Sequence, residues 1–256
     1  MVMQIKILGC YGGIGGAMRT TSMLVDDDVL IDAGTGVGDL SLDALLKIDH
    51  IFVTHSHLDH IGFIPLLLDT VMGLRAKPIT VHATAQVINV LKLHIFNWLI
   101  WPDFNAIPNT AFPLLSYKEI SLGNPVTINQ KVITALPANH VVPAVGYQID
   151  SGTHSLVFTG DTAGGKDFWD EVNKINNLKY LIIETAFSNA EADLAVLAKH
   201  LCPRTLATEL AQLSSTPEVF ITHLKPSEDK TILEEIAANP KTQHCQALRQ
   251  QQVFDL

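Results

Sequence analysis

The sequence predicts an α/β protein in which two β-sheets pack face to face and helices cover their outer sides. Runs of apolar and β-branched residues, typical of short strands, recur in both halves of the chain. Segments with helical periodicity accompany the strands in each half. Apolar residues make up 47% of the 256 residues and charged residues 17%, which indicates a globular chain with a sizeable core.

The first half is expected to alternate between strands and helices. Ser41 is a suitable N-cap for one of these helices, and the helix beginning near Phe63 is apolar almost all round, so it should be buried. The predicted strands are 4–8, 22–26, 29–32, 51–54 and 79–81, and the predicted helices are 41–46, 63–74 and 84–97.

The second half begins with several strands in succession and then adds helices. Short β-branched runs bounded by Gly, Asn and Asp mark the strands, and apolar residues with a period near 3.6 mark the helices. The predicted strands are 126–128, 132–136, 144–149, 156–159, 180–184 and 219–222, with one more in 246–256. The predicted helices are 168–175, 194–201, 205–213 and 228–238.

Residues 98–117 interrupt this pattern with an insertion rich in proline and aromatic side chains. Proline removes a backbone donor and blocks a continuous helix, so the insertion should be irregular. It is either a lid over a pocket or a partner subunit, or an ordinary packed insertion. Because no linker or solenoid repeat is visible, residues 1–256 are expected to form a single domain that includes it.

Charge and hydropathy restrict the classes of partner. The net charge is −9, and the four arginines and 13 lysines are scattered, which argues against extended nucleic acid but not against a small phosphate ester. No run of about 18 charge-free apolar residues appears, so no membrane span is expected. No secretory signal is visible, and three distant cysteines (Cys10, Cys202 and Cys245) fit a reducing compartment, so a cytoplasmic location is expected.

The stretch 51–62, IFVTHSHLDHIG, is the strongest functional signal. Four apolar or β-branched residues predict a buried strand, after which three histidines and one aspartate follow within six positions. Alternation directs His55 and His57 to the same side, and Asp59 and His60 can reach a neighbouring position. Because one ion rarely takes four ligands from so short a segment, the stretch predicts two adjacent metals.

Three further predicted strands end in candidate ligands. His140 lies in LPANHVV, Asp161 in VFTGDTAGG and His223 in VFITHLKP. One histidine at a strand end is usually structural. Together with the four residues of the HSHLDH stretch, however, these three make seven ligands, which is the number that two ions need if one carboxylate bridges them.

These motifs, with RTTSMLV and LIDAG near the N-terminus, resemble the metallo-β-lactamase superfamily over nearly the whole chain. The resemblance implies the αββα sandwich, which agrees with the strand pattern. It also implies a first metal held by His55, His57 and His140, a second held by Asp59, His60 and His223, and Asp161 as the bridge.

The expected chemistry is dinuclear-metal hydrolysis. Two divalent ions roughly 3.5–4 Å apart lower the pKa of a bridging water, which attacks as hydroxide, and stabilise charge on the attacked centre. Asp59 and Asp161 are placed to orient this nucleophile. Zinc suits the imidazole and carboxylate ligands, and manganese or iron are the alternatives.

Finer features resemble class II cyclic-nucleotide phosphodiesterases. HSHLDH itself, IWPDF (100–104), IIETAF (182–187) and KHLCP (199–203) carry this likeness, although Phe63 stands where that family often has a small residue. By resemblance to the related ribonuclease Z group, Glu184 would orient His200. His200 would then protonate the departing 3′ oxygen or bind phosphate.

The remaining histidines receive lesser roles. His94 precedes the aromatic insertion and is a candidate for lining the substrate pocket. His82 is expected in the core at a strand end. His50, His154 and His244 are expected on the surface.

Four functions are compatible with these features. The first is a phosphodiesterase that opens 3′,5′-cyclic AMP or cyclic GMP to the 5′-monophosphate. The second is a ribonuclease Z-like processor of transfer-RNA 3′ ends, which the charge of −9 disfavours. The third is another metal hydrolase, such as an arylsulfatase or an enzyme acting on lactones or thioesters. The fourth is a non-catalytic module, which the complete ligand set disfavours. The expected partner is a small phosphodiester substrate, and the apolar insertion suggests a homodimer.

Overall fold

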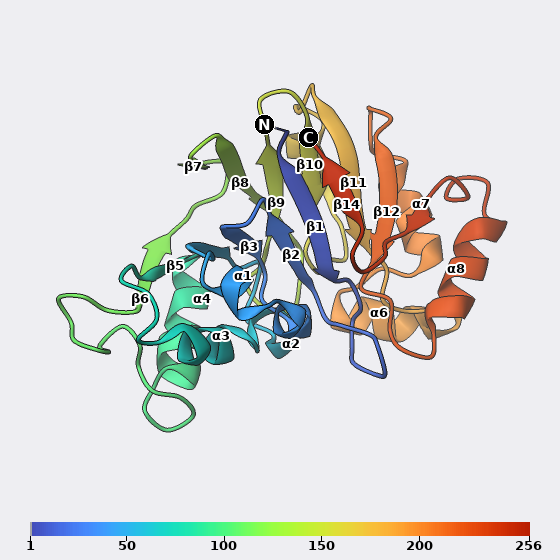
Figure 1. The fold of residues 1–256 in the computed structure, drawn as a ribbon. Coiled ribbons are helices and arrows are strands. Elements are labelled where there is room, and N and C mark those ends of the chain that lie inside the picture. Colours follow the sequence, from blue (N-terminus) through green and yellow to red (C-terminus); the bar gives the residue numbers. More distant parts are fainter. Residues whose placement is uncertain (1) are drawn as a thin grey trace.

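The computed structural model describes residues 2–256 and contains two seven-stranded mixed sheets that face each other (Figure 1). The order in the first sheet is β14-β1-β2-β3-β4-β5-β6, and in the second it is β13-β12-β11-β10-β9-β8-β7. The two chain ends lie close together at one end of the sandwich, and α2 and α6 lie at the other (Figure 1). This arrangement confirms the predicted α/β sandwich.

In the first sheet, β1 to β3 are antiparallel and β3 to β6 run parallel. The turn between β2 and β3 passes through Asp26, whose φ is +52°. The strands are β1 (Gln4–Gly9), β2 (Ser22–Val25), β3 (Val29–Ile31), β4 (His50–Phe52), β5 (Ile79–Ala83), β6 (Leu115–Glu119) and β14 (Val253–Asp255).

In the second sheet, β7 to β10 are antiparallel and β10 to β13 run parallel. Parallel strands bring their carboxyl ends to one edge of a sheet, which gathers the loops after β10, β11 and β12. The strands are β7 (Pro125–Ile128), β8 (Lys131–Pro137), β9 (Val145–Asp150), β10 (Ser155–Phe158), β11 (Leu178–Glu184), β12 (Glu218–Thr222) and β13 (Gln246–Ala247).

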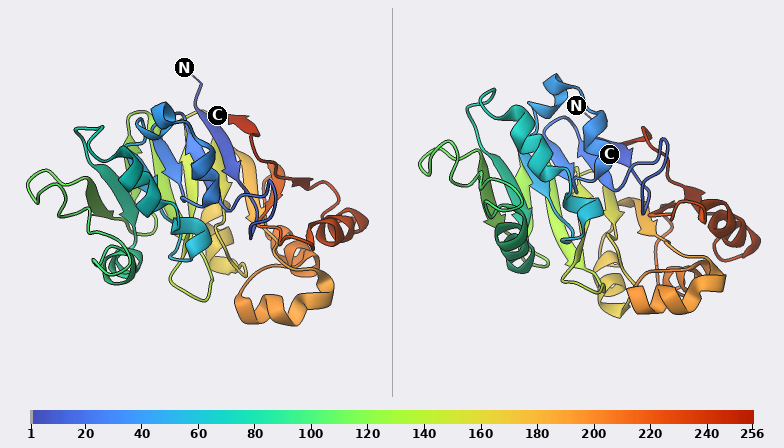
Figure 2. Two further views of the ribbon diagram at one scale, coloured as in Figure 1. Left: turned by 60° about the horizontal axis from the view of Figure 1, so that its bottom comes forward. Right: turned by 90° about the horizontal axis from the view of Figure 1, so that it is seen from below.

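Helices cover the outer side of each sheet (Figure 2). Ser41 caps the first of them by accepting a hydrogen bond from the Ala44 amide, as its sequence predicts. The helices are α1 (Leu42–Leu45), α2 (Leu58–Ile61), α3 (Ile64–Val71), α4 (Ala85–Val90), α5 (Lys166–Val172), α6 (Ala192–Ala198), α7 (Pro203–Leu210) and α8 (Asp229–Ala238), with 3₁₀ turns at Thr35–Asp39 and Asn189–Glu191.

Three groups of buried apolar side chains hold these layers together. The first lies between the sheets and includes Phe52, Tyr147 and Phe220. The second joins the first sheet to α3 and α4, and the third joins the second sheet to α5, α7 and α8. The loops at the sheet edges are therefore anchored on rigid strands. No helix within residues 2–256 has the length and apolar character needed to cross a membrane.

Three predicted helices differ from their sequence patterns. α3 ends at Val71 and leaves Leu66 45% exposed, so the expectation that it is buried all round is wrong. The predicted helix 84–97 changes to a π-helical turn at Leu91–Ile95. The predicted helix 194–201 ends at Ala198 because Lys199 takes a φ of +52°, which releases the next residue from the helix.

The insertion after the π-helical turn is irregular until β6 begins at Leu115, as its prolines predict. Phe104 is buried, whereas Trp98, Leu99 and Ile100 are 63%, 88% and 64% exposed. The insertion therefore packs on the core through several apolar side chains, among them Phe104, Trp101 and Leu114, and leaves another run of large apolar side chains on the surface.

The prediction that His50 lies on the surface is wrong. β4 begins at His50 and lies between β3 and β5, so this side chain is half-buried, and its Nδ1 is 3.0 Å from Nε2 of His82. His82 is buried, as expected, and its ring stacks on Phe52 with centroids 4.3 Å apart. His244 is exposed and His154 partly so.

The buried His82 is expected to make the fold sensitive to acid. Burial, followed by the charges of His50 and Lys118, lowers its pKa to about 3, whereas an unfolded histidine has a pKa near 6.5. Below pH 6.5 the unfolded chain gains a proton that the folded chain does not, so stability falls as the pH drops toward 3. Between pH 7 and pH 5 this residue should cost about 2 kcal/mol.

Urea unfolding of the wild type and His82→Phe at both pH values, in chelator, tests this prediction. The phenyl ring keeps the stacking on Phe52 but cannot take up a proton. The variant should lose about 2 kcal/mol less than the wild type between the two pH values. Equal losses in both proteins would show that His82 does not contribute to the acid sensitivity.

Candidate metal centre

The seven candidate ligands meet at the edge of the sandwich where the strands end. The loop after β4 carries His55 and His57, the N-cap of α2, and α2 carries Asp59 and His60. Rigid strand ends and one short helix thus supply all of the side chains. They are His55, His57, Asp59 and His60 from the first sheet, with His140 after β8, Asp161 after β10 and His223 after β12 from the second sheet.

These side chains form two groups that share one carboxylate. The ligand atoms of His55, His57, His140 and Asp161 lie within 4.8 Å of one another, and so do those of Asp59, His60, Asp161 and His223. The grouping is the same as the division that the sequence resemblance implies, with Asp161 common to both.

Asp161 lies at the centre of the two groups. One of its oxygens is 3.7 Å from Nε2 of His55, and the other is 3.4 Å from Nε2 of His60 and 3.2 Å from Nδ1 of His223. Asp161 is only 2% exposed. A buried carboxylate surrounded by imidazoles at these separations is suited to bridge two cations.

Several ring nitrogens in the cluster have no hydrogen-bond partner. Nε2 of His55, Nε2 of His60 and Nδ1 of His223 are buried without one. Buried polar atoms are usually paired, so three unpaired nitrogens facing one carboxylate need an explanation. The donor set of imidazoles and carboxylates fits divalent metal ions, which would satisfy all three atoms.

Burial would lower the pKa of His60, but the carboxylates of Asp161 and Asp32 raise it well above 6.5, so a metal would have to displace a proton there. The protonation states of three other histidines agree directly with metal binding. Burial, only partly offset by the negative charge of Asp161, lowers the pKa of His140 to about 4 and that of His223 to about 3. Burial also lowers the pKa of His55 well below 6.5. These imidazoles are therefore neutral at neutral pH, which is the form that ligates a metal.

Asp32 orients two ligands, although the sequence analysis did not assign it a role. Its Oδ2 accepts a hydrogen bond from Nδ1 of His60 at 2.7 Å and another from the Thr54 hydroxyl at 2.8 Å, and its Oδ1 accepts the Thr54 amide at 2.8 Å. The same hydroxyl lies 3.0 Å from Nδ1 of His55. These contacts fix the Nδ1 atoms of His55 and His60, and they leave the Nε2 atom of each ring available to a metal.

A sequence signal for Asp32 exists. It directly follows β3, and β3 pairs in parallel with β4, the strand that leads into His55. A carboxylate at the end of a strand adjacent to a ligand-bearing strand is in position to support those ligands.

His140 and Lys199 hold each other by reciprocal hydrogen bonds. The His140 Nδ1 atom is 3.1 Å from the Lys199 carbonyl oxygen, and the Lys199 ammonium donates to the His140 carbonyl at 3.0 Å. Nε2 of His140 then faces the cluster, 3.3 Å from Nδ1 of His57. The left-handed conformation of Lys199 makes this contact accessible, because it turns the chain back after α6.

The structure brings Glu184 and His200 together, as the sequence predicts. Oε1 of Glu184 is 2.7 Å from Nδ1 of His200, and its Oε2 accepts the Leu201 amide at 3.2 Å. The His200 ring centroid is 5.0 Å from that of His140 and 5.2 Å from that of His223. The pair therefore borders both groups of the cluster.

Charge favours the protonated form of His200. Burial alone would lower the pKa of this imidazole, but the carboxylates of Glu184 and Asp161 raise it above 6.5 overall. Glu184 is fully buried. A protonated imidazole beside the cluster is suited to donate a proton to a leaving group.

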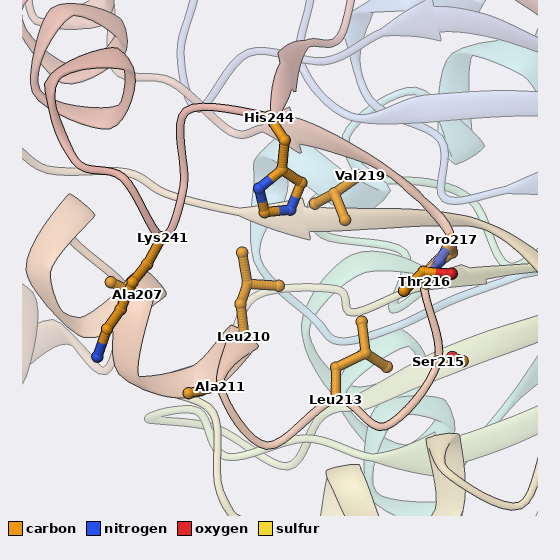
Figure 3. Close-up of a pocket in the computed structure, with 10 residues that line it drawn as sticks. All are labelled: Ala207, Leu210, Ala211, Leu213, Ser215, Thr216, Pro217, Val219, Lys241 and His244. Carbon is orange, nitrogen blue, oxygen red and sulfur yellow. The ribbon is translucent and has the colours of Figure 1, made fainter.

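The structure does not bring His94 to this cluster. It is exposed on the π-helical turn, and no contact joins it to the ligands within residues 2–256. The hollow drawn in Figure 3 is also separate from the site. It measures about 530 Å³ and is lined mainly by α7, the loop that follows it and the start of β12, including Leu210, Leu213 and Val219.

A second hollow, of about 690 Å³, does border the cluster. It is lined by the loop that carries His140, by Lys199 and by Gln86 near the start of α4. Such a volume is typical of a small-molecule site.

The fold and the ligand set together define a class of protein. Residues 28–224 match the family model described as β-lactamase superfamily domain. The chain belongs to the β-lactamase superfamily, and its cluster of His and Asp residues is the metal-binding centre expected of a metallo-hydrolase.

Several relatives and solved structures are similar to this chain. A probable 3′,5′-cyclic-nucleotide phosphodiesterase of Yersinia pestis is 27% identical over 71% of the chain, and a ribonuclease Z of Haloarcula marismortui is 30% identical over 64%. The alignments span 58% and 52% of those two proteins, so the chain covers little more than half of their length. The crystal structure of unliganded yeast PDE1 superposes with a TM-score of 0.81 at 20% identity, covering 100% of this chain and 99% of that one.

Proposed function

We propose that this chain is a dinuclear-metal phosphodiesterase that converts 3′,5′-cyclic nucleotides to 5′-monophosphates. The observation that carries the proposal is the Glu184–His200 pair beside a complete set of seven ligands. Hydrolysis of an alkyl phosphodiester expels an alkoxide, which needs a proton, and His200 is a placed proton donor. The resemblance to the Yersinia pestis protein supports a cyclic nucleotide as the diester.

The chain's own residues have distinct tasks in this reaction. Two divalent cations held by the seven ligands would activate a water molecule and stabilise negative charge on the phosphate. Asp59, whose side chain is 28% exposed, can accept a hydrogen bond from the attacking water. Glu184 holds Nδ1 of His200, so Nε2 remains free to give its proton to the departing 3′ oxygen. We propose zinc as the native metal, with manganese or iron as alternatives.

A small diester suits this surface better than RNA. The net charge of −9 would repel a polyanion, and the exposed insertion residues are apolar rather than basic. The hollow beside His140 is in the size range of small-ligand pockets. The second candidate is a ribonuclease Z-like activity, which the Haloarcula marismortui relative favours. An arylsulfatase or another ester hydrolase is the third.

We also propose that the protein forms a homodimer. The exposed side chains of Trp98, Leu99 and Ile100 support this proposal. Adjacent large apolar groups on a surface are typical of interaction sites. Sedimentation of the wild type and of a variant with Leu99→Asp would test it, since a charge in a buried interface should shift the protein toward monomer.

The proposed activity is tested by incubating metal-loaded protein with 3′,5′-cyclic AMP and following 5′-AMP by chromatography. Asp161→Ala serves as the inactive control. Turnover by the wild type alone supports the proposal. Cleavage of bis-p-nitrophenyl phosphate without turnover of cyclic AMP would shift the assignment to RNA or another diester. Inactivity on both substrates would favour a sulfatase or ester hydrolase.

A further inference from the structure

Thr162 is a buried threonine whose hydrogen bonds join two loops of the metal centre. It follows Asp161 directly and is 2% exposed. Its Oγ1 accepts the backbone amide of Asn139 at 3.0 Å and the backbone amide of Gly164 at 3.0 Å. The Ala163 amide also donates to the Asn139 carbonyl at 2.9 Å, so the loop of Asp161 and the loop of His140 are linked at two points.

The backbone of Thr162 reaches a third part of the site. Its amide donates at 3.0 Å to Oε1 of Glu184, and this same oxygen is 2.7 Å from Nδ1 of His200. Thr162 therefore touches the bridging carboxylate's loop, the loop of one metal ligand and the carboxylate that holds the proton donor. These parts come from the ends of three strands, β8, β10 and β11.

We propose that Thr162 is a positioning residue that fixes His140 and the Glu184–His200 pair relative to Asp161. Its hydrogen bonds go to Asn139, Gly164 and Glu184 rather than to the ligand atoms. Its hydroxyl is suited to this task because one oxygen can accept two amides at once. Small displacements of metal ligands and of the proton donor have large effects on rate. Loss of the hydrogen bonds that the Thr162 hydroxyl accepts should therefore impair both metal binding and turnover.

The test uses three variants of the full chain. Thr162→Val keeps the shape but removes the acceptor, and Thr162→Ser keeps the acceptor. Thr242→Val is the matched control, because Thr242 is also fully buried and its hydroxyl donates to the Ile236 and Asn239 carbonyls rather than to a residue of the site. Zinc affinity is measured by competition with a chromogenic chelator, and kcat and KM are measured on bis-p-nitrophenyl phosphate and cyclic AMP.

We expect Thr162→Val to lose about 10- to 100-fold in zinc affinity and in kcat, which is the usual effect of removing a residue that orients ligands. KM should change little, since the residue does not touch substrate. Thr162→Ser should restore both quantities to near the wild type, and Thr242→Val should leave them unchanged. Circular dichroism and thermal unfolding establish that each variant is folded.

Two results would overturn the inference. One is wild-type zinc affinity and kcat in Thr162→Val. The other is a serine variant as impaired as the valine variant, which would show that the acceptor is not what matters. If the valine variant does not fold, Thr162→Ala removes the same acceptor without the added methyl groups. The part concerning His200 rests on the proposed function, but zinc affinity needs no substrate, so failure of the cyclic AMP assay would leave this test intact.

Discussion

Replacing Asp161 with alanine is expected to remove metal binding and activity together. Asp161 is the only residue common to both ligand groups, and its two oxygens lie 3.2–3.7 Å from three imidazole nitrogens. Without it, His55 would lose its neighbouring carboxylate, and only Asp59, 3.7 Å from Nε2 of His60 and 3.9 Å from Nε2 of His223, would remain beside the other two. The rate should fall by at least about 10³-fold, because the metals supply several kcal/mol of charge stabilisation.

Metal content by elemental analysis and kcat/KM on a diester together measure this effect. Asp69→Ala is the matched control, because Asp69 is an exposed carboxylate on α3, away from the cluster. It should retain metal and rate. An Asp161→Ala protein that still binds two metals per chain and turns over at the wild-type rate would refute the site assignment.

Removing the imidazole of His200 is expected to lower kcat by an amount that depends on the leaving group of the substrate. On cyclic AMP, His200→Ala should lower kcat by about 10²–10⁴-fold, because the 3′ alkoxide leaves poorly without a proton. On bis-p-nitrophenyl phosphate the loss should be far smaller, since p-nitrophenolate leaves unprotonated. Glu184→Gln should produce the same pattern more weakly, because it removes the charge that keeps His200 protonated.

The comparison of two substrates separates proton donation from a structural role. A variant with a distorted site would lose both activities in parallel. His244→Ala, which removes an exposed imidazole near the hollow of Figure 3, is the control and should affect neither. Equal losses on both substrates in His200→Ala would show that His200 does not act as the acid.

The strand pattern and the ligand set could be predicted well from the sequence because both are local signals. Alternating or continuous apolar runs mark strands wherever they pack, and β1, β2, β9 and β12 begin and end within a residue or two of the predicted bounds. HSHLDH places three histidines and one aspartate within six residues, so they can be predicted as metal ligands without knowledge of distant contacts. The helix ends were less predictable, because the left-handed turn at Lys199 has no glycine to signal it.

The sequence and its family resemblance predicted which residues carry the chemistry: seven candidate ligands and a Glu–His pair. The tertiary structure decided how these residues are held. Asp32 contacts His60 across 28 positions, Thr162 contacts Glu184 across 22, and His140 contacts Lys199 across 59. Such hydrogen bonds depend on how neighbouring strands of one sheet bring their ends and the following loops together, and the spacing of residues along the chain does not encode that approach. The contacts by which these residues position the site are therefore seen only once the strands of each sheet have paired.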